Sequence, residues 1–325
     1  MAIIDRAGAE TLINAEMSRE IMSGLTSPDT ANGSVVLKLG RRLSDMSSRQ
    51  MHLPVTSLLP VAYWQDGADL SAKDIAAKRV TAAAWDKVTL TAEELAVIVL
   101  ISENTLDDSD CDIWSYIRPL IIDAFGEKID SAVLFGTGAP NGSPTALVTA
   151  ATTAGNVITA GAGDAYDELL GSGGLISLIE NSGYVPNGHI GRISTRGYLR
   201  GIRDDAGQPL FRPMSGMGRS TRYELDGVGV HFPANGVMEN SDTMLITGDF
   251  NQLVYSIRQD ITMKLLDQAT VVDGANTYHL AQQDMIGLRV KMRLAWATPN
   301  PVTRIKPTFS DDSRFPFAVL NEATS

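Results

Sequence analysis

A single long helical pattern occupies the middle of the chain and constrains its shape. Apolar residues recur there at three- and four-residue steps, which is typical of a helix that buries one face. They are Trp114, Ile117, Ile121, Ala124, Phe125, Ile129, Ala132 and Val133. One helix over residues 113–135 would be about 35 Å long, ending at the glycines from Gly136 onward. Because Pro119 removes a backbone hydrogen bond, the helix either kinks there or begins near it.

Length and composition exclude several classes of protein. The 325 residues suggest about two domains. The longest apolar run, residues 95–101, is the length of a strand and too short for a membrane span. A single cysteine, Cys111, excludes an internal disulfide and a zinc site built on several thiolates, and favours synthesis in a reducing cytoplasm. The net charge of -11 argues against a protein whose main task is to wrap nucleic acid.

Two strand-like runs enclose a polar, alanine-rich insert. The runs cover residues 58–64 and 85–101, and the insert lies between them. Connections of about 20 residues without structure are uncommon inside compact domains. We therefore expect a long hairpin arm whose strands pair and whose exposed edges need a neighbouring molecule.

The remaining segments mix helix and strand patterns without a regular repeat. This favours an α+β fold over a doubly wound sheet. We expect helices over residues 7–25 and 165–181, the second interrupted by glycines, and a Gly-, Ala- and Thr-rich connection over residues 136–163. Strands are expected over residues 35–43, 224–232, 243–246, 253–257, 261–266 and 285–296.

No constellation of residues points to catalysis, a cofactor or a metal. His52, His189, His231 and His279 are scattered. Alternating aspartates from Asp108 resemble the start of a calcium loop, but Ile113 and Pro119 stand where its glycine and glutamate would be. The sequence GTGAPNG follows a helix and not a strand, so we interpret it as a helix stop. An enzyme with a glycine-rich nucleotide loop remains a weaker alternative.

Several side chains are candidates for contact with another subunit. The last long strand places basic residues on one face, which is either solvated or salt-bridged, or faces a neighbour or nucleic acid. Basic residues on the arm are either simply solvated or meet an acidic patch of a neighbour. The candidate contacts are Trp64, Lys73, Lys78, Arg79, Arg289, Lys291 and Arg293.

Five stretches in order carry a resemblance to a known family. They are VTLTAEELAVIVLISENTLDDS followed by the long helix, LRGIRDDAGQPLFRP, ELDGVGVHFP, ITGDFNQLVYSIRQDITMKL and LRVKMRLAWATPNP. In this order and spacing they resemble the major capsid proteins of tailed phages, which have the Hong Kong 97-type fold. The resemblance covers nearly the whole chain.

The resemblance implies a division of the chain into five parts. These would be an N-terminal arm (1–54), an extension-loop hairpin (55–99), a peripheral domain with a long spine helix (100–143 and 250–310), an axial domain (144–249) and a C-terminal tail (311–325).

The resemblance also implies a function in a virion. Copies of the chain would form pentamers and hexamers, assembled in the host bacterial cytoplasm, that close an icosahedral shell around double-stranded DNA without reading its sequence. Scaffold, portal and decoration proteins are further candidate partners, and no membrane is involved. Covalent cross-linking stays unassigned, because Lys73 and Lys78 have no asparagine or glutamate that matches the family's pattern. The alternative is an encapsulin-like compartment that encloses protein cargo.

Overall fold

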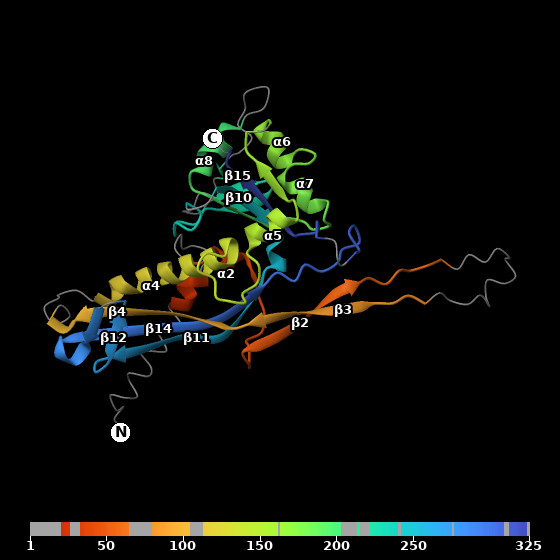
Figure 1. Cartoon of the computed structure of the whole chain (residues 1–325). Coiled ribbons are helices and arrows are strands. Elements are labelled where there is room, and N and C mark those ends of the chain that lie inside the picture. Colours follow the sequence, from red (N-terminus) through yellow and green to blue (C-terminus); the bar gives the residue numbers. More distant parts are fainter. Residues whose placement is uncertain are drawn as a thin grey trace, which may run out of the picture.

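The computed structural model has an elongated lower body, an upper domain and an arm that extends away from both (Figure 1). It describes residues 21–26, 33–64, 80–104, 113–161, 163–202, 213–214, 222–239, 242–274, 276–308 and 312–323. Helices and strands are intermixed, so the predicted α+β class is confirmed.

A four-stranded sheet with the order β1-β11-β14-β4 forms the base of the lower body. The predicted last long strand is confirmed as β14, and the two strands predicted before it are one strand, β11, which continues through irregular register. The elements of this region are β1 (Arg41–Arg42), β4 (Glu93–Ser102), η3 (Phe250–Gln252), β11 (Val254–Leu266), β12 (Thr270–Asp273), β13 (Asn276–His279), η4 (Leu280–Gln282) and β14 (Met285–Ala297).

The long helix α4 (Ile113–Asp130) lies along one face of this sheet (Figure 1). Its side chains Ile121, Phe125 and Ile129 share a buried core with the inward side chains of β14. One π-helical turn, η2 (Ser131–Phe135), extends the helix before Gly136 ends it. The predicted helix over residues 113–135 is therefore present, and its apolar stripe positions it on the sheet.

Two details of the helix differ from the expectation or resolve it. Pro119 lies inside α4, so the helix does not begin there. Ala124 is exposed, and its assignment to the buried stripe was wrong. Ile121 and Phe125 are four residues apart and lie on the helix face that packs on the sheet. Ala124 is rotated away from that face. The side chain of Trp114 lies outside the described residues.

The upper domain is built on a seven-stranded sheet with the order β5-β15-β10-β6-β9-β8-β7. Its helices and strands pack around a second buried cluster that includes Leu169, Ile179 and Leu320. The elements are α5 (Leu147–Thr153), β5 (Val157–Thr159), α6 (Ala165–Leu170), α7 (Leu175–Glu180), β6 (Gly188–Gly191), α8 (Thr195–Gly201), β7 (Pro213–Met214), β8 (Arg222–Leu225), β9 (Val228–His231), β10 (Thr243–Gly248) and β15 (Phe317–Asn321).

Local sequence signals account for part of the upper domain. The interrupted helix is confirmed as α6 and α7, and the strand over residues 243–246 as β10. The segment expected as one strand over residues 224–232 is instead a hairpin, because Asp226 and Gly227 both have positive φ, as a tight turn requires. The connection over residues 136–163 contains α5 and β5. Residues 317–321, which the resemblance placed in a C-terminal tail, form a buried strand of this sheet.

The arm consists of an antiparallel pair, β2 (Gln50–Leu58) and β3 (Ala84–Thr91). The predicted hairpin is present, but the positions of its strands were wrong. The first strand was predicted over residues 58–64, whereas β2 ends at Leu58. The predicted run over residues 85–101 is divided at Ala92 between β3 in the arm and β4 in the lower sheet. At this division Leu90 and Ala92 are both buried against the lower sheet.

The segment after Gly33 is a short helix, α2 (Val35–Leu39), where the sequence suggested a strand. Its N-terminus is capped by Ser34 and by the carboxylate of Asp130 at the end of α4. These two side chains accept hydrogen bonds from the first backbone N–H groups of α2, which stabilises the helix although its valines favour a strand. The predicted helix over residues 7–25 lies mostly outside the described residues, and residues 21–26 are helical.

Asp130 is fully buried and accepts four hydrogen bonds. The donors are Ser34 Oγ at 2.6 Å, Val35 N at 2.9 Å, Val36 N at 3.1 Å and Asn235 Nδ2 at 2.9 Å. The carboxylate therefore joins the N-terminal segment, the long helix and the loop after β9. Burial raises the pKa of Asp130 from 3.8 to about 6, although its hydrogen bonds act in the opposite direction.

Gly126, one helical turn before Asp130, lets the N-terminal segment cross the helix closely. A Cβ atom at Gly126 would lie 2.6 Å from the carbonyl carbon of Gly33. Gly33 itself has a φ of 124°, which favours glycine. The two glycines and the Asp130 carboxylate together fix this crossing.

We expect the ionisation of Asp130 to lower stability as pH rises. The folded state holds the proton more tightly than the unfolded state, so the effect is absent below about pH 4 and complete above the folded pKa of about 6. The shift corresponds to about 3 kcal/mol. Urea unfolding of unassembled wild-type protein and Asp130→Asn across this range measures it, because asparagine cannot ionise. A difference in unfolding free energy between the two proteins that is independent of pH would contradict the assignment.

Candidate inter-subunit surfaces

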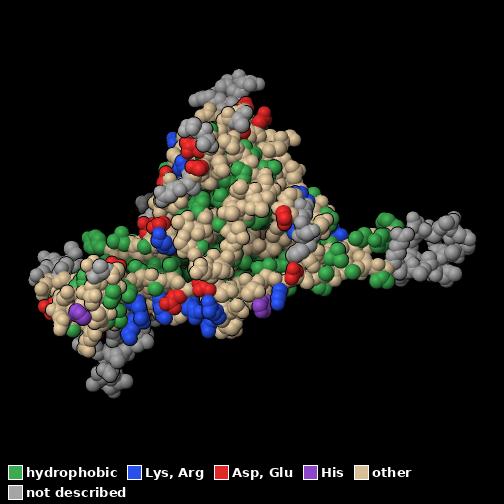
Figure 2. All heavy atoms as spheres, in the orientation of Figure 1, with side chains coloured by type: hydrophobic (Ala, Val, Ile, Leu, Met, Phe, Trp, Pro, Cys, Tyr) green, Lys and Arg blue, Asp and Glu red, His purple; other side chains and the backbone are tan. Residues whose placement is uncertain are grey.

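The arm presents large apolar side chains to solvent beyond its paired strands. Trp64 is 94% exposed and Val80 is 97% exposed, and they precede and follow the tip of the arm. Figure 2 shows apolar side chains along the described part of the arm, far from the body. Contiguous exposed apolar surface of this kind marks an interaction site. The others are Leu58, Val61, Tyr63 and Trp85.

The root of the arm, in contrast, is packed on the lower sheet. Leu90 and Ala92 are buried against Val254, Ala295 and Ala297. A hydrogen bond of 3.0 Å from Val61 N to Thr81 Oγ1 keeps the two sides of the arm together farther out. The root therefore holds the arm outward, and the outer half has an apolar surface that its own subunit does not cover. The candidates Lys73, Lys78 and Arg79 lie outside the described residues.

The three basic residues of β14 lie on the face of the sheet opposite α4. Arg289, Lys291 and Arg293 alternate with the buried Val290 and Met292, as the pattern predicted. Figure 2 shows Lys and Arg side chains gathered along this lower side of the body. The strand thus brings together the three residues that the sequence proposed.

Like charges oppose each other on this basic face. Arg289 is the direct cross-strand partner of Lys264, and such pairs are destabilising. Among the described residues, the one ion pair made by the β14 cations joins Lys291 Nζ to Glu94 at 3.9 Å. The Nε atoms of Arg258 and Arg293 are buried and have no hydrogen-bond partner in the described structure. The face therefore has an excess of positive charge available for an anionic partner.

Other polar clusters are structural. His189 is buried between Thr247 Oγ1 at 2.9 Å and the Leu225 carbonyl at 3.3 Å, and burial lowers its pKa to about 4.

In the described residues no three His, Cys, Asp or Glu side chains are grouped as a metal site would require. No described helix has the length and apolarity needed to cross a membrane. Gly136 has a φ of 74° and closes the helix, which confirms the helix-stop interpretation of GTGAPNG.

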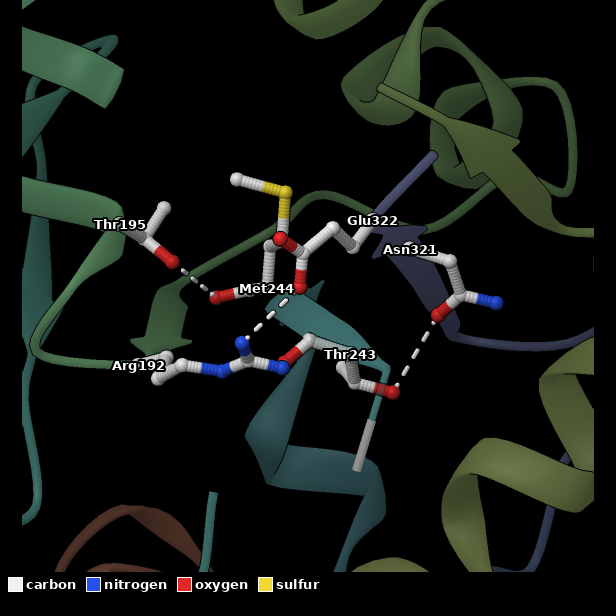
Figure 3. Close-up of polar contacts among 6 residues, drawn as sticks. All are labelled: Arg192, Thr195, Thr243, Met244, Asn321 and Glu322. Carbon is white, nitrogen blue, oxygen red and sulfur yellow. Dashed lines mark hydrogen bonds and ion pairs between the residues drawn. The ribbon is translucent and has the colours of Figure 1, made fainter. Parts of the chain in front are cut away.

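Polar contacts also fasten the end of β15 to its neighbours, as Figure 3 shows. Arg192 Nη1 pairs with Glu322 at 3.1 Å, and Thr243 Oγ1 donates to Asn321 Oδ1 at 3.3 Å. Thr195 donates to the carbonyl of Met244 at 3.0 Å. These contacts stabilise the upper sheet.

Sequence reasoning identified Trp64 but missed most of the apolar arm surface. The signal was present, since Val61 and Tyr63 lie shortly before the polar insert and Val80 lies near its end. These residues were predicted as parts of the arm, but periodicity alone does not show which of its apolar side chains remain exposed.

The comparisons with known proteins agree on one family. The model of the phage capsid family matches residues 9–303. A major capsid protein from Staphylococcus phage 80alpha is 26% identical over 285 residues, which are 85% of this chain and 80% of the relative. A solved structure from Mycobacterium phage Bobi is 31% identical and has a TM-score of 0.74, with all of both chains covered. One from Mycobacterium phage Adephagia is 29% identical with the same TM-score, covering 100% of this chain and 99% of the other.

Trp64→Ser should weaken self-association without affecting the fold. Because Trp64 is 94% exposed, we expect the free energy of unfolding to change by less than about 0.5 kcal/mol. Leu90→Ala is the matched control at the buried root and should cost about 2–5 kcal/mol. Urea unfolding and sedimentation velocity separate the two effects. A large loss of stability in Trp64→Ser would mean that its indole packs within its own subunit.

Proposed function

The chain belongs to the phage capsid family and is the major capsid protein of a tailed phage, and we propose that its arm lies over the adjacent copy in the shell. The family is structural. The chain has the Hong Kong 97-type fold, and copies of it associate to form the capsid of the virion.

The observation that supports the arm proposal is the division of the arm into a buried root and an apolar outer half. The root is held by Leu90 on its own sheet, while Trp64 and Val80 are almost fully exposed. Burying exposed apolar side chains contributes about 25 cal/mol per Å². Each subunit provides one such contact, and the weak contacts add around a closed ring. We propose pentameric and hexameric rings that close an icosahedral shell around double-stranded DNA.

The basic face is proposed as a second contact between copies. The whole chain carries a net charge of -11, so a neighbouring copy offers abundant carboxylates. Arg289 and Lys264 repel each other in the isolated subunit, and an acidic partner would relieve that repulsion. The candidates Lys73, Lys78 and Arg79 of the arm remain part of this proposal on the basis of sequence alone.

The domain division fits the positions of the elements and remains a proposal. The lower body would be the peripheral domain with α4 as its spine, and the upper domain would be the axial domain near the ring axis. The strand β15 joins the upper sheet, so the proposed axial domain would include residues 317–321 in addition to residues 144–249. We also propose, from the resemblance alone, that the chain contacts scaffold, portal and decoration proteins and that it assembles in the host cytoplasm.

An encapsulin-like compartment with protein cargo is the alternative function. The relatives found are phage proteins, which favours the capsid. Particles purified from cells and treated with nuclease distinguish the two, because a phage shell protects DNA of genome length and a cargo compartment does not.

Deleting residues 67–83 should leave a folded subunit that does not form closed particles. The deletion removes Val80 and the tip of the arm but leaves the whole of the β2-β3 pair. We expect an unchanged cooperative unfolding transition and a loss of closed shells in negative-stain electron microscopy. Normal particles from the deletion variant would refute the proposed contact of the arm with its neighbour.

Charge reversal on the basic face tests the second contact. Arg289→Glu combined with Lys291→Glu should reduce particle yield at least about tenfold, if the lost contact is worth about 1.4 kcal/mol or more. Arg200→Glu, on the exposed side of α8, is the matched control and should assemble normally. If particles form normally but retain less DNA, the face contacts DNA and not a neighbouring copy.

A further inference from the structure

Residues 300–308, here called the bridging loop, connect β14 to the last part of the chain and touch both the arm and the upper domain. The loop begins just after the lower sheet, so it is covalently attached to the lower body. Its contacts therefore join all three parts of the subunit.

The first side of the bridging loop holds the arm beyond its packed root. Val302 N donates to the carbonyl of Thr56 at 3.2 Å. Arg304 Nη1 donates to the carbonyl of Pro60 at 2.7 Å. The two acceptors are four residues apart along the arm, so the two bonds resist a rotation that one bond alone would allow.

The second side of the bridging loop is fixed to the upper domain, after α7. Thr303 Oγ1 donates to the carbonyl of Ser182 at 2.8 Å, and the hydroxyl of Tyr184 donates to the carbonyl of Pro301 at 2.7 Å. A Cβ at Gly183 would lie 2.8 Å from Thr303 Oγ1, so the loop and the turn are in close contact. The upper domain therefore determines where the loop lies.

A buried arginine makes the bridging loop rigid. Arg314 is 2% exposed, and its guanidinium donates to the carbonyls of Thr308 at 2.6 Å, Asn300 at 3.3 Å and Lys306 at 3.4 Å. The side chain of Asn300 returns a bond to the Arg314 carbonyl at 2.6 Å. Charge-assisted bonds to several carbonyls fix the backbone of the loop. A rigid loop can transmit a displacement from one contact to the other.

We propose that Arg304 is a positioning residue that fixes the direction of the arm relative to the upper domain. Through the bridging loop, a shift of the upper domain moves the carbonyl of Pro60 and with it the outer arm. The consequence for assembly rests on the proposed contact of the arm with a neighbouring copy. The geometric coupling itself is a property of the single subunit.

Distances between spin labels in unassembled subunits test the coupling. With Cys111 replaced by serine, labels at Ala62→Cys on the arm and Glu180→Cys on α7 report the angle between arm and upper domain. We expect Arg304→Ala to broaden this distance distribution at least about twofold. A label pair at Glu180→Cys and Arg200→Cys, both in the upper domain, should not change. The thermal unfolding midpoint should also stay constant, since Arg304 is exposed.

Two further variants make the test specific. Arg304→Lys keeps a donor that can reach the carbonyl of Pro60 and should restore a narrow distribution. Thr303→Val removes the bond to the Ser182 carbonyl and the bond from Lys306 N, and should broaden the arm distribution as Arg304→Ala does, although it leaves the Arg304 side chain in place. An unchanged distribution in both Arg304→Ala and Thr303→Val would overturn the proposal.

Particle assembly separates this inference from the proposed function. If the distances broaden and particle yield falls, both are supported. If the distances broaden but particles form normally, Arg304 positions the arm, and the arm contact is not needed for the shell.

Discussion

The crossing of the N-terminal segment over the long helix is the contact on which the rest of the lower body depends. A buried carboxylate, Asp130, accepts four hydrogen bonds from two other segments, the N-terminal one and the loop after β9, and Gly126 allows the backbones to approach. The crossing places α2 on the core and leads directly into β1, the edge strand of the lower sheet. A buried carboxylate is costly unless its hydrogen bonds are complete. The fold is therefore specified here by polar groups within an apolar core.

Local periodicity predicted the parts of the fold that a single segment determines. The helix over residues 113–135 and the strand β14 were correct because each has a clear apolar stripe in its own sequence. The break in the helical segment of the upper domain was correct because glycines mark it in the sequence. Strongly periodic segments retain their structure in most tertiary contexts.

The errors occurred where distant residues decide the local structure. Residues 35–39 have the composition of a strand, but Asp130 caps them as a helix from far along the chain. The run over residues 85–101 is divided near Ala92, because its first part pairs with β2 and its second part pairs with β14. The basic face was predicted from alternation in β14, whereas the opposed Lys264 belongs to another strand. Neither packing nor pairing of this kind can be read from one segment.

The arm is held away from the body only when the lower sheet, on which its root packs, has formed. Leu90 and Ala92 come from the first third of the chain, yet they rest on Val254, Ala295 and Ala297 from its last third. Loop-closure entropy must be overcome before such distant segments meet. A partly folded chain therefore lacks the sheet surface that supports the arm. The arm is therefore held outward only after the first and last thirds of the chain have packed together.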